Sequence, residues 1–192
     1  MKKTIALLIG SAWALCAADM TIATLYDSQL KMVESEVVSL AEAMPESAYN
    51  FAPTQGAFEK VRTFGEQVKH IAAVIYMAGA AAAKEKPPVE LGSGEGGPEA
   101  VKSKAQTVQY LKDSFAYGHR VMAKLTAENQ LEMVPAPFPE MPPMARAAIA
   151  NLTIWHSFDH YGQMAVYARM NGVIPPASAP PPPAAAQGKK KK

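Results

Sequence analysis

Residues 155–163 read Trp155-His156-Ser157-Phe158-Asp159-His160-Tyr161-Gly162-Gln163, and they lie within a helix predicted over about 144–170. Residues four apart leave the same face of a helix one turn apart, so the imidazoles of His156 and His160 project together. One divalent ion could take a nitrogen from each ring. Two histidines bonded to carbonyls or water would explain the same spacing, and the pair alone leaves both interpretations open.

Working outward from this stretch, helical periodicity predicts three earlier helices, over about 22–44, 63–84 and 99–127. The second has a clear start, because Thr63-Phe64-Gly65-Glu66 matches a capping box. Strand-like alternation is nearly absent. Four amphipathic helices of this length predict an all-α fold, a four-helix bundle.

The connection between the second and third predicted helices is long, about 85–98. It could extend roughly 45 Å, enough to run the length of a bundle and join two parallel helices. It contains Gly92-Ser93-Gly94-Glu95-Gly96-Gly97-Pro98, which lacks the Gly-Lys-Ser/Thr ending of a phosphate-binding loop. A nucleotide site is therefore not expected there.

The N-terminus is typical of a secretory signal peptide over residues 1–18. Lys2 and Lys3 precede a short uncharged run that ends in Cys16-Ala17-Ala18. A buried N-terminal helix and lipoprotein processing at Cys16 are the weaker alternatives. Cleavage after Ala18 would remove the only cysteine and leave 17 basic against 17 acidic residues. We therefore expect an exported protein, periplasmic or secreted, without a disulfide or a thiolate of its own.

The C-terminus, residues 175–192, is rich in proline and alanine and ends in Lys189-Lys190-Lys191-Lys192. This composition predicts a disordered tail. The lysines could touch nucleic acid or anionic lipid. A solvated tail is the simpler explanation of the lysines, so no nucleic-acid partner and no stable membrane anchor are expected. Residues 19–174 remain as one domain.

A third histidine, His70, lies on the second predicted helix, on an apolar flank with Val74 and Met77. On its own it is more often a core histidine than a ligand. Glu66, one turn earlier, could reach a metal, although its capping role explains it as well. Asp159 could accept a hydrogen bond from a ligand's ring N–H. His119 is assigned no role.

Taken together, these segments resemble the DinB superfamily over about 22–178. The likeness is carried by Tyr49-Asn50-Phe51-Ala52-Pro53, by residues 61–72, by the His156-to-Gln163 stretch and by the exit at 171–178. The resemblance implies an up-down-down-up four-helix bundle that holds a divalent ion, nickel or zinc being common. It also implies that His70, His156 and His160 are the three ligands.

The resemblance leaves the reaction open. Some relatives are thiol-dependent transferases or isomerases, whereas many have no known activity. We expect an exported protein that binds a divalent metal ion. Such a protein could be a metal-dependent enzyme that acts on an unknown small molecule. A thiol transferase, a metal-dependent hydrolase, and a non-catalytic binding or structural bundle, with a homodimer through a spare apolar face, are the alternatives. Candidates to line a pocket or orient a substrate are Gln163, Tyr167, Tyr49 and Phe51.

Overall fold

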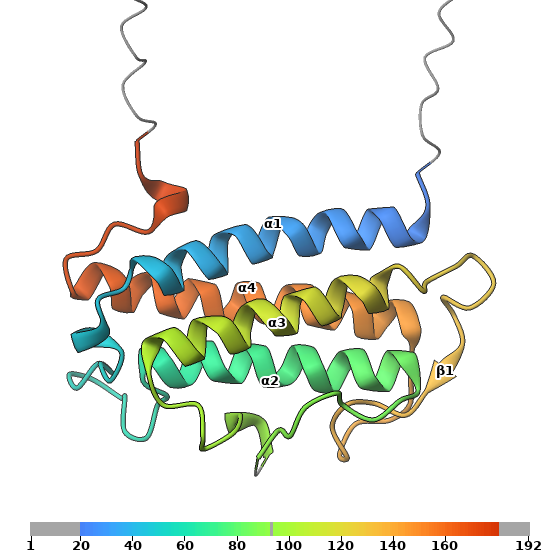
Figure 1. The fold of residues 1–192 in the computed structure, drawn as a ribbon, viewed down its shortest axis with the longest axis horizontal. Helices are drawn as coiled ribbons and strands as arrows, with labels where there is room; N and C mark the ends of the chain where they lie inside the picture. Colours follow the sequence, from blue (N-terminus) through green and yellow to red (C-terminus); the bar gives the residue numbers. More distant parts are fainter. Residues whose placement is uncertain (1–19, 93, 181–192) are drawn as a thin grey trace, which may run out of the picture.

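The computed structural model describes residues 20–92 and 94–180, which fold into a bundle of four helices (Figure 1). Three 3-10 turns and one short strand pair lie in the connections between and after them. The helices are α1 Ile22–Ala43, α2 Phe64–Ala83, α3 Lys104–Met122 and α4 Arg146–Met170; the turns are η1 Glu46–Ala48, η2 Gly94–Gly96 and η3 Pro176–Ser178. The all-α class and the four helices predicted from periodicity are confirmed.

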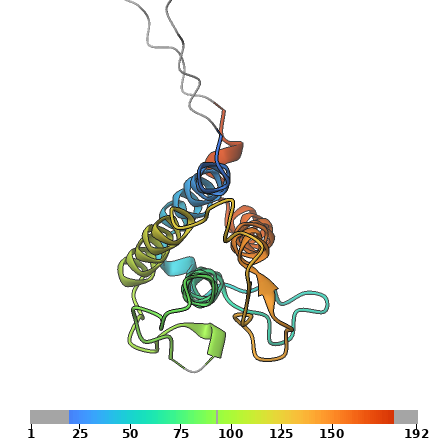
Figure 2. The same cartoon turned by 90° about the vertical axis from the view of Figure 1, so that its right-hand side faces the viewer.

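The helices occupy the corners of a square when viewed along the bundle (Figure 2). α2 packs against α3 and α4, and α1 packs against the same two helices, so α1 and α2 lie diagonally opposite. In Figure 1, α1 and α4 run in one direction while α2 and α3 run in the other. The topology is thus up-down-down-up. The long connection between α2 and α3 joins two parallel helices, which its length makes possible.

Local capping explains where three of the helices begin. Thr63 accepts a hydrogen bond from the Glu66 amide, and the Glu66 carboxylate accepts one from the Thr63 amide, which confirms the predicted capping box. Matching boxes start α1 at Thr21 and α3 at Ser103. α2 ends at Lys84, whose left-handed backbone (φ 58°) allows the Glu85 amide to bond back to the Ala80 carbonyl.

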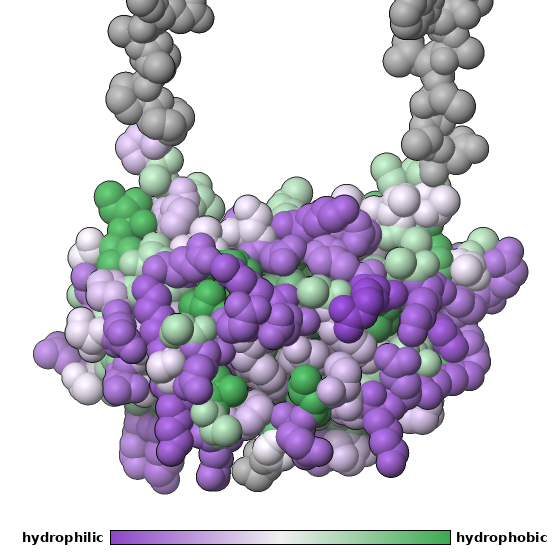
Figure 3. Space-filling model, in the orientation of Figure 1, coloured by the Kyte–Doolittle hydropathy of each residue, from purple (hydrophilic) through white to green (hydrophobic). Residues whose placement is uncertain are grey.

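α2 is the most deeply packed helix, because η2 and the connection that carries it cover the side that α3 and α4 leave open. Gly79 lets Tyr117 of α3 lie directly against the α2 backbone: a Cβ at position 79 would lie 2.5 Å from Cε1 of this buried tyrosine. On the face of the molecule shown in Figure 3, hydrophobic residues of the described part form separate spots among charged and polar ones.

Two features differ from the expectations. α3 spans Lys104–Met122 rather than 99–127, because the capping box at Ser103 sets its start and a turn closed by Thr126 and Asn129 follows its end. A short antiparallel pair, β1 Met133–Val134 and β2 Met144–Ala145, leads into α4 with Met133 opposite Ala145. Strands of two residues are too short to carry a periodicity, so sequence patterns could not predict them.

The predicted signal peptide lies outside the described residues, as do residues 181–192 of the predicted tail. The start of that tail forms η3, which packs against α1, and Arg169 donates a hydrogen bond to the Ser178 hydroxyl. Among the helices described here, none is both long and apolar enough to cross a bilayer.

Candidate metal centre

Three histidines converge where α2 faces α4. His70 projects from the middle of α2, and His156 and His160 leave one face of α4 a single turn apart. The Nε2 atoms of His70 and His156 are 3.1 Å apart, and each ring contributes one nitrogen to a set whose members all lie within 4.8 Å of one another. Zinc–imidazole bonds of about 2.0–2.1 Å place two ligand nitrogens at roughly such separations. One ion could therefore be held by all three rings.

The backbone of η2 orients the His70 ring. His70 Nδ1 lies 3.0 Å from the carbonyl oxygen of Glu95, and a carbonyl can only accept, so Nδ1 carries the proton. Nε2 of this neutral ring is then a lone pair directed at the cluster. The Glu95 carboxylate is 3.5 Å from the Arg62 guanidinium, an ion pair that ties η2 to the start of α2.

A chain of side-chain amides orients His160. Its Nδ1 donates to Oε1 of Gln67, and Gln67 Nε2 donates to Oε1 of Gln163 at 2.9 Å. Gln163 Nε2 in turn donates to the Asp159 carboxylate at 3.2 Å. Because the carboxylate only accepts, every donor in the chain points toward it, which fixes both amides and leaves Nε2 of His160 unprotonated. A ligand histidine whose second nitrogen donates in this way is a more basic and better-oriented ligand.

The donor set suits a cation. Two of the three rings present lone pairs to the same small space, and His156 can offer them at most one proton. His156 Nδ1 is buried and has no hydrogen-bond partner among residues 20–92 and 94–180. A cluster with more acceptors than donors is costly when buried, and a divalent ion shared by the Nε2 atoms relieves it.

Burial keeps the rings in the neutral form that binds metals. His70 is 3% exposed and His160 is 8% exposed. Loss of hydration lowers the pKa of His156 to about 3, and repulsion from His160 and His70 adds to it. The pKa of His160 falls to about 4, again mainly through burial, and the pKa of His70 is also lowered by burial. Near pH 7 all three rings are therefore neutral, each with one ring nitrogen free of a proton.

The remaining predicted residues fall into two groups. Gln163 and Asp159 belong to the amide chain, and the two amides of Gln67 and Gln163 separate Asp159 from the ring N–H of His160, so Asp159 is not bonded to it directly. Tyr167 instead packs edge-on against Phe51 at 5.8 Å. Tyr49 donates to the Ala41 carbonyl, which ties α1 to the start of α2, and it lines a separate cavity of about 330 Å³ there. Glu66 serves the capping box.

Two residues that hold the ligands carried no predicted role. Gln67 lies three residues before the candidate ligand His70, but its contact with His160 exists only once α4 is docked on α2. Glu95 acts through its backbone carbonyl, which every residue has, so no residue type could have signalled it. His119, also without a predicted role, bonds to Asp27 and Glu34 at 2.6 and 2.9 Å and joins α3 to α1.

Comparisons with known proteins agree on the fold. A family model described as DinB superfamily matches residues 29–164. A DinB-like protein from Bacillus cereus ATCC 10987 superposes with a TM-score of 0.63 and 15% identity, covering 81% of this chain and 96% of that one. A DinB-like protein from Bacillus subtilis gives a TM-score of 0.59 and 18% identity, covering 77% and 92%. No curated protein matches significantly.

Proposed function

The chain belongs to the DinB superfamily, and from this premise we propose that it binds one divalent metal ion through His70, His156 and His160. The observation that carries the proposal is the convergence of three neutral imidazoles from two helices, of which those of His70 and His160 are buried and that of His156 is half-buried. Histidine rings of 3% and 8% exposure are rarely gathered without a shared partner, because each buried ring nitrogen needs one.

Three neutral imidazoles without a thiolate favour zinc or nickel among the common divalent ions. A site with three protein ligands also leaves a position for an exogenous molecule, unlike a structural site closed by a fourth ligand. When bound, such an ion supplies a Lewis acid that lowers the pKa of a coordinated water or thiol. The chain's own part is to hold three lone pairs in place through Glu95 and the Gln67–Gln163–Asp159 chain.

The test is metal stoichiometry in protein purified without a polyhistidine tag. We expect one equivalent of zinc or nickel in the wild type by elemental analysis, and loss of that equivalent in His156→Ala. The matched control is His119→Gln, which removes the one histidine outside the cluster and should leave loading unchanged. Full loading of His156→Ala at wild-type affinity would refute the ligand assignment.

A reaction, if there is one, would use a small molecule at the open position. Turnover of an electrophile together with a small thiol would identify a transferase, and turnover of simple esters or amides a hydrolase. Stoichiometric metal without turnover of either would identify a binding protein. His156→Ala is the control in each assay, because it should abolish any turnover that depends on the metal.

We further propose that the protein is exported. The support is the pair Lys2 and Lys3, the short apolar run after them, and the small residues up to Ala18. Expression in a bacterial host with fractionation should give a periplasmic or secreted protein that begins at Asp19. Intact mass showing Met1 retained on exported protein would contradict it.

A further inference from the structure

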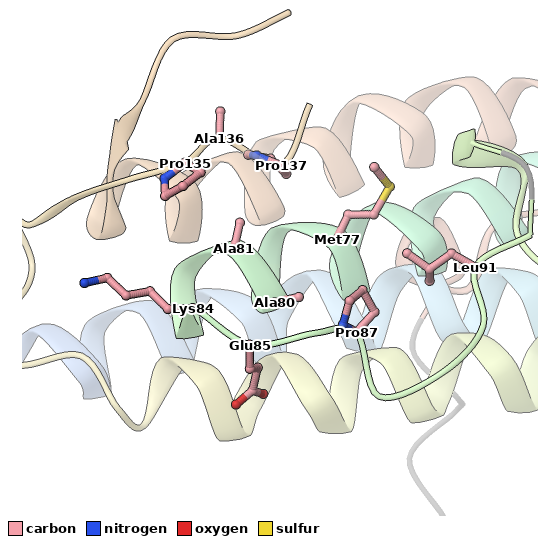
Figure 4. Close-up of a pocket in the computed structure, with 10 residues that line it drawn as sticks. All are labelled: Met77, Ala80, Ala81, Lys84, Glu85, Pro87, Leu91, Pro135, Ala136 and Pro137. Atoms are coloured by element: carbon pink, nitrogen blue, oxygen red, sulfur yellow. The ribbon is translucent and has the colours of Figure 1, made fainter. Parts of the chain in front are cut away.

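A second concave site lies beyond the histidines, along the outer side of α2. Figure 4 shows it between the last turns of α2, the connection that follows, and the loop at 135–137 that precedes β2. Its volume is about 620 Å³, which falls within the range of small-molecule sites. The apolar residues that line it include Met77, Ala81, Leu91 and Ala136.

The two charged residues at this groove already have partners elsewhere. The Lys84 ammonium is paired with the Glu132 carboxylate. The Glu85 carboxylate accepts a hydrogen bond from the Tyr117 hydroxyl at 3.0 Å and lies 3.4 Å from the Lys124 ammonium. With both charges neutralised, the groove offers an ionic ligand no net charge, so the ligand that fits it is neutral.

The walls are rigid and the floor is adaptable. Pro87, Pro135 and Pro137 line the groove, and proline has fixed φ and no N–H to donate. Met77 and Leu91 are half-buried, so their side chains lie recessed in the groove. The apolar anchor residues of a flat protein interface would instead project from the surface. An unbranched methionine side chain fills gaps of variable shape. A preformed apolar recess of this kind binds ligands with little ordering cost.

We propose that this groove binds a neutral, largely apolar small molecule. A polyproline segment such as Pro180–Pro183 of this chain is the poorer occupant, because such segments dock on aromatic side chains and none of the residues lining the groove is aromatic. A second copy of the chain would need a patch of about 800 Å² per partner, far wider than this recess.

The groove and the metal centre share one stripe of α2. Met77 follows His70 by seven residues, about 10 Å along the axis on the same face, and Ala81 and Lys84 continue the stripe. The Leu91 end of the groove leads into η2, whose Glu95 carbonyl holds His70. Binding in the groove needs no metal, so the proposal stands or falls separately from the metal site.

The test uses two dyes that share a ring system and differ in charge. N-phenyl-1-naphthylamine is neutral, whereas 1-anilinonaphthalene-8-sulfonate carries a sulfonate. We expect the full-length protein to bind the neutral dye saturably at one site, seen as a fluorescence increase, and to bind the anionic dye at least tenfold more weakly. Equal affinities would overturn the neutral-ligand assignment.

Two filling variants and one control locate the dye. Ala81→Phe, on α2, and Ala136→Phe, in the 135–137 loop, should each weaken binding of the neutral dye at least tenfold. Ala116→Phe places the same ring on the exposed side of α3 and should leave it unchanged. Circular dichroism and metal content verify that each variant is folded. Wild-type affinity in both filling variants, or displacement of the dye by a peptide of residues 175–192, would overturn the proposal.

Discussion

Gln67 links the two helices of the metal centre through both ends of one amide. Its oxygen accepts from His160 and its nitrogen donates to Gln163, and the side chain is only 2% exposed. The residue is therefore a positioning residue for His160 rather than a ligand.

We predict that Gln67→Leu lowers metal affinity about 10–100-fold, because His160 loses the acceptor that fixes its tautomer. Gln67→Glu keeps an acceptor for the His160 N–H and should retain most of the affinity. Titration against a chelating indicator dye measures both. Wild-type affinity in Gln67→Leu would show that the amide chain does not orient the ligand.

The lowered pKa values of the three histidines predict how the metal-free protein responds to acid. Below about pH 6.5 the unfolded chain takes up protons on these imidazoles, whereas the native rings, with pKa values of about 3 for His156 and about 4 for His160, stay neutral. Their contribution to stability is thus present above pH 6.5 and is lost as the pH falls.

Urea unfolding of metal-free protein from pH 7 to pH 4 should show this loss, on the order of a few kcal/mol from these groups. A variant with His156→Gln and His160→Gln should lose less stability over the same range. A pH dependence identical in the wild type and the double variant would contradict the assignment of the effect to these two rings.

At the scale of the elements, the packing of α2 on α3 depends on one missing side chain. The Cβ of an alanine at position 79 would lie 2.5 Å from Tyr117 Cε1 and 3.1 Å from its Cδ1. The Tyr117 ring cannot easily retreat, because it stacks on Tyr76 at 5.5 Å and its hydroxyl bonds to Glu85.

Gly79→Ala should therefore destabilise the protein by about 1–3 kcal/mol, even though alanine favours a helix over glycine by roughly 1 kcal/mol. The control is Gly162→Ala on the exposed side of α4, where a Cβ would meet nothing within 4 Å and the change should stabilise. Chemical unfolding of both variants gives the comparison. A stable Gly79→Ala protein would mean that the α2–α3 contact is looser than described.

Element boundaries were predictable where the signal is local. Thr63 and Glu66 fix the start of α2 within four residues of sequence, and that prediction was confirmed. The start of α3 carries an equivalent signal at Ser103 and Gln106, which periodicity alone overlooked by extending the helix to residue 99. The contact of His119 with Asp27 and Glu34 joins residues about 90 positions apart, so no window of sequence contains it.

At the scale of the whole molecule, the same limit applies to the candidate site. The spacing of His156 and His160 predicts a shared face, and the structure places both rings there. That His70 meets them required the family resemblance, because the order of helices around the bundle cannot be read from any one helix. Gln67 and the Glu95 carbonyl escaped prediction since their roles arise only from packing between elements.

Metal binding should stabilise the whole bundle, because the ligands come together only in the native state. At a free ion concentration about 1,000 times the Kd, the stabilisation is about 4 kcal/mol. For a domain of this size that corresponds to a rise in Tm of roughly 8–16 °C. Differential scanning calorimetry with zinc or nickel, and then with excess chelator, measures the shift. The variant His70→Ala should show little of it, and an unchanged wild-type Tm would exclude a native-state metal site.

The 86 residues that separate His70 from His156 also set an order of events. During synthesis the first ligand emerges long before the other two, and the site does not exist until the last helix has docked on the second. Metal binding at the proposed three-histidine site would then follow the docking of α4 on α2. The compartment in which α4 docks would then determine which ions the proposed site meets, so the identity of the bound metal would depend on location as well as on coordination chemistry.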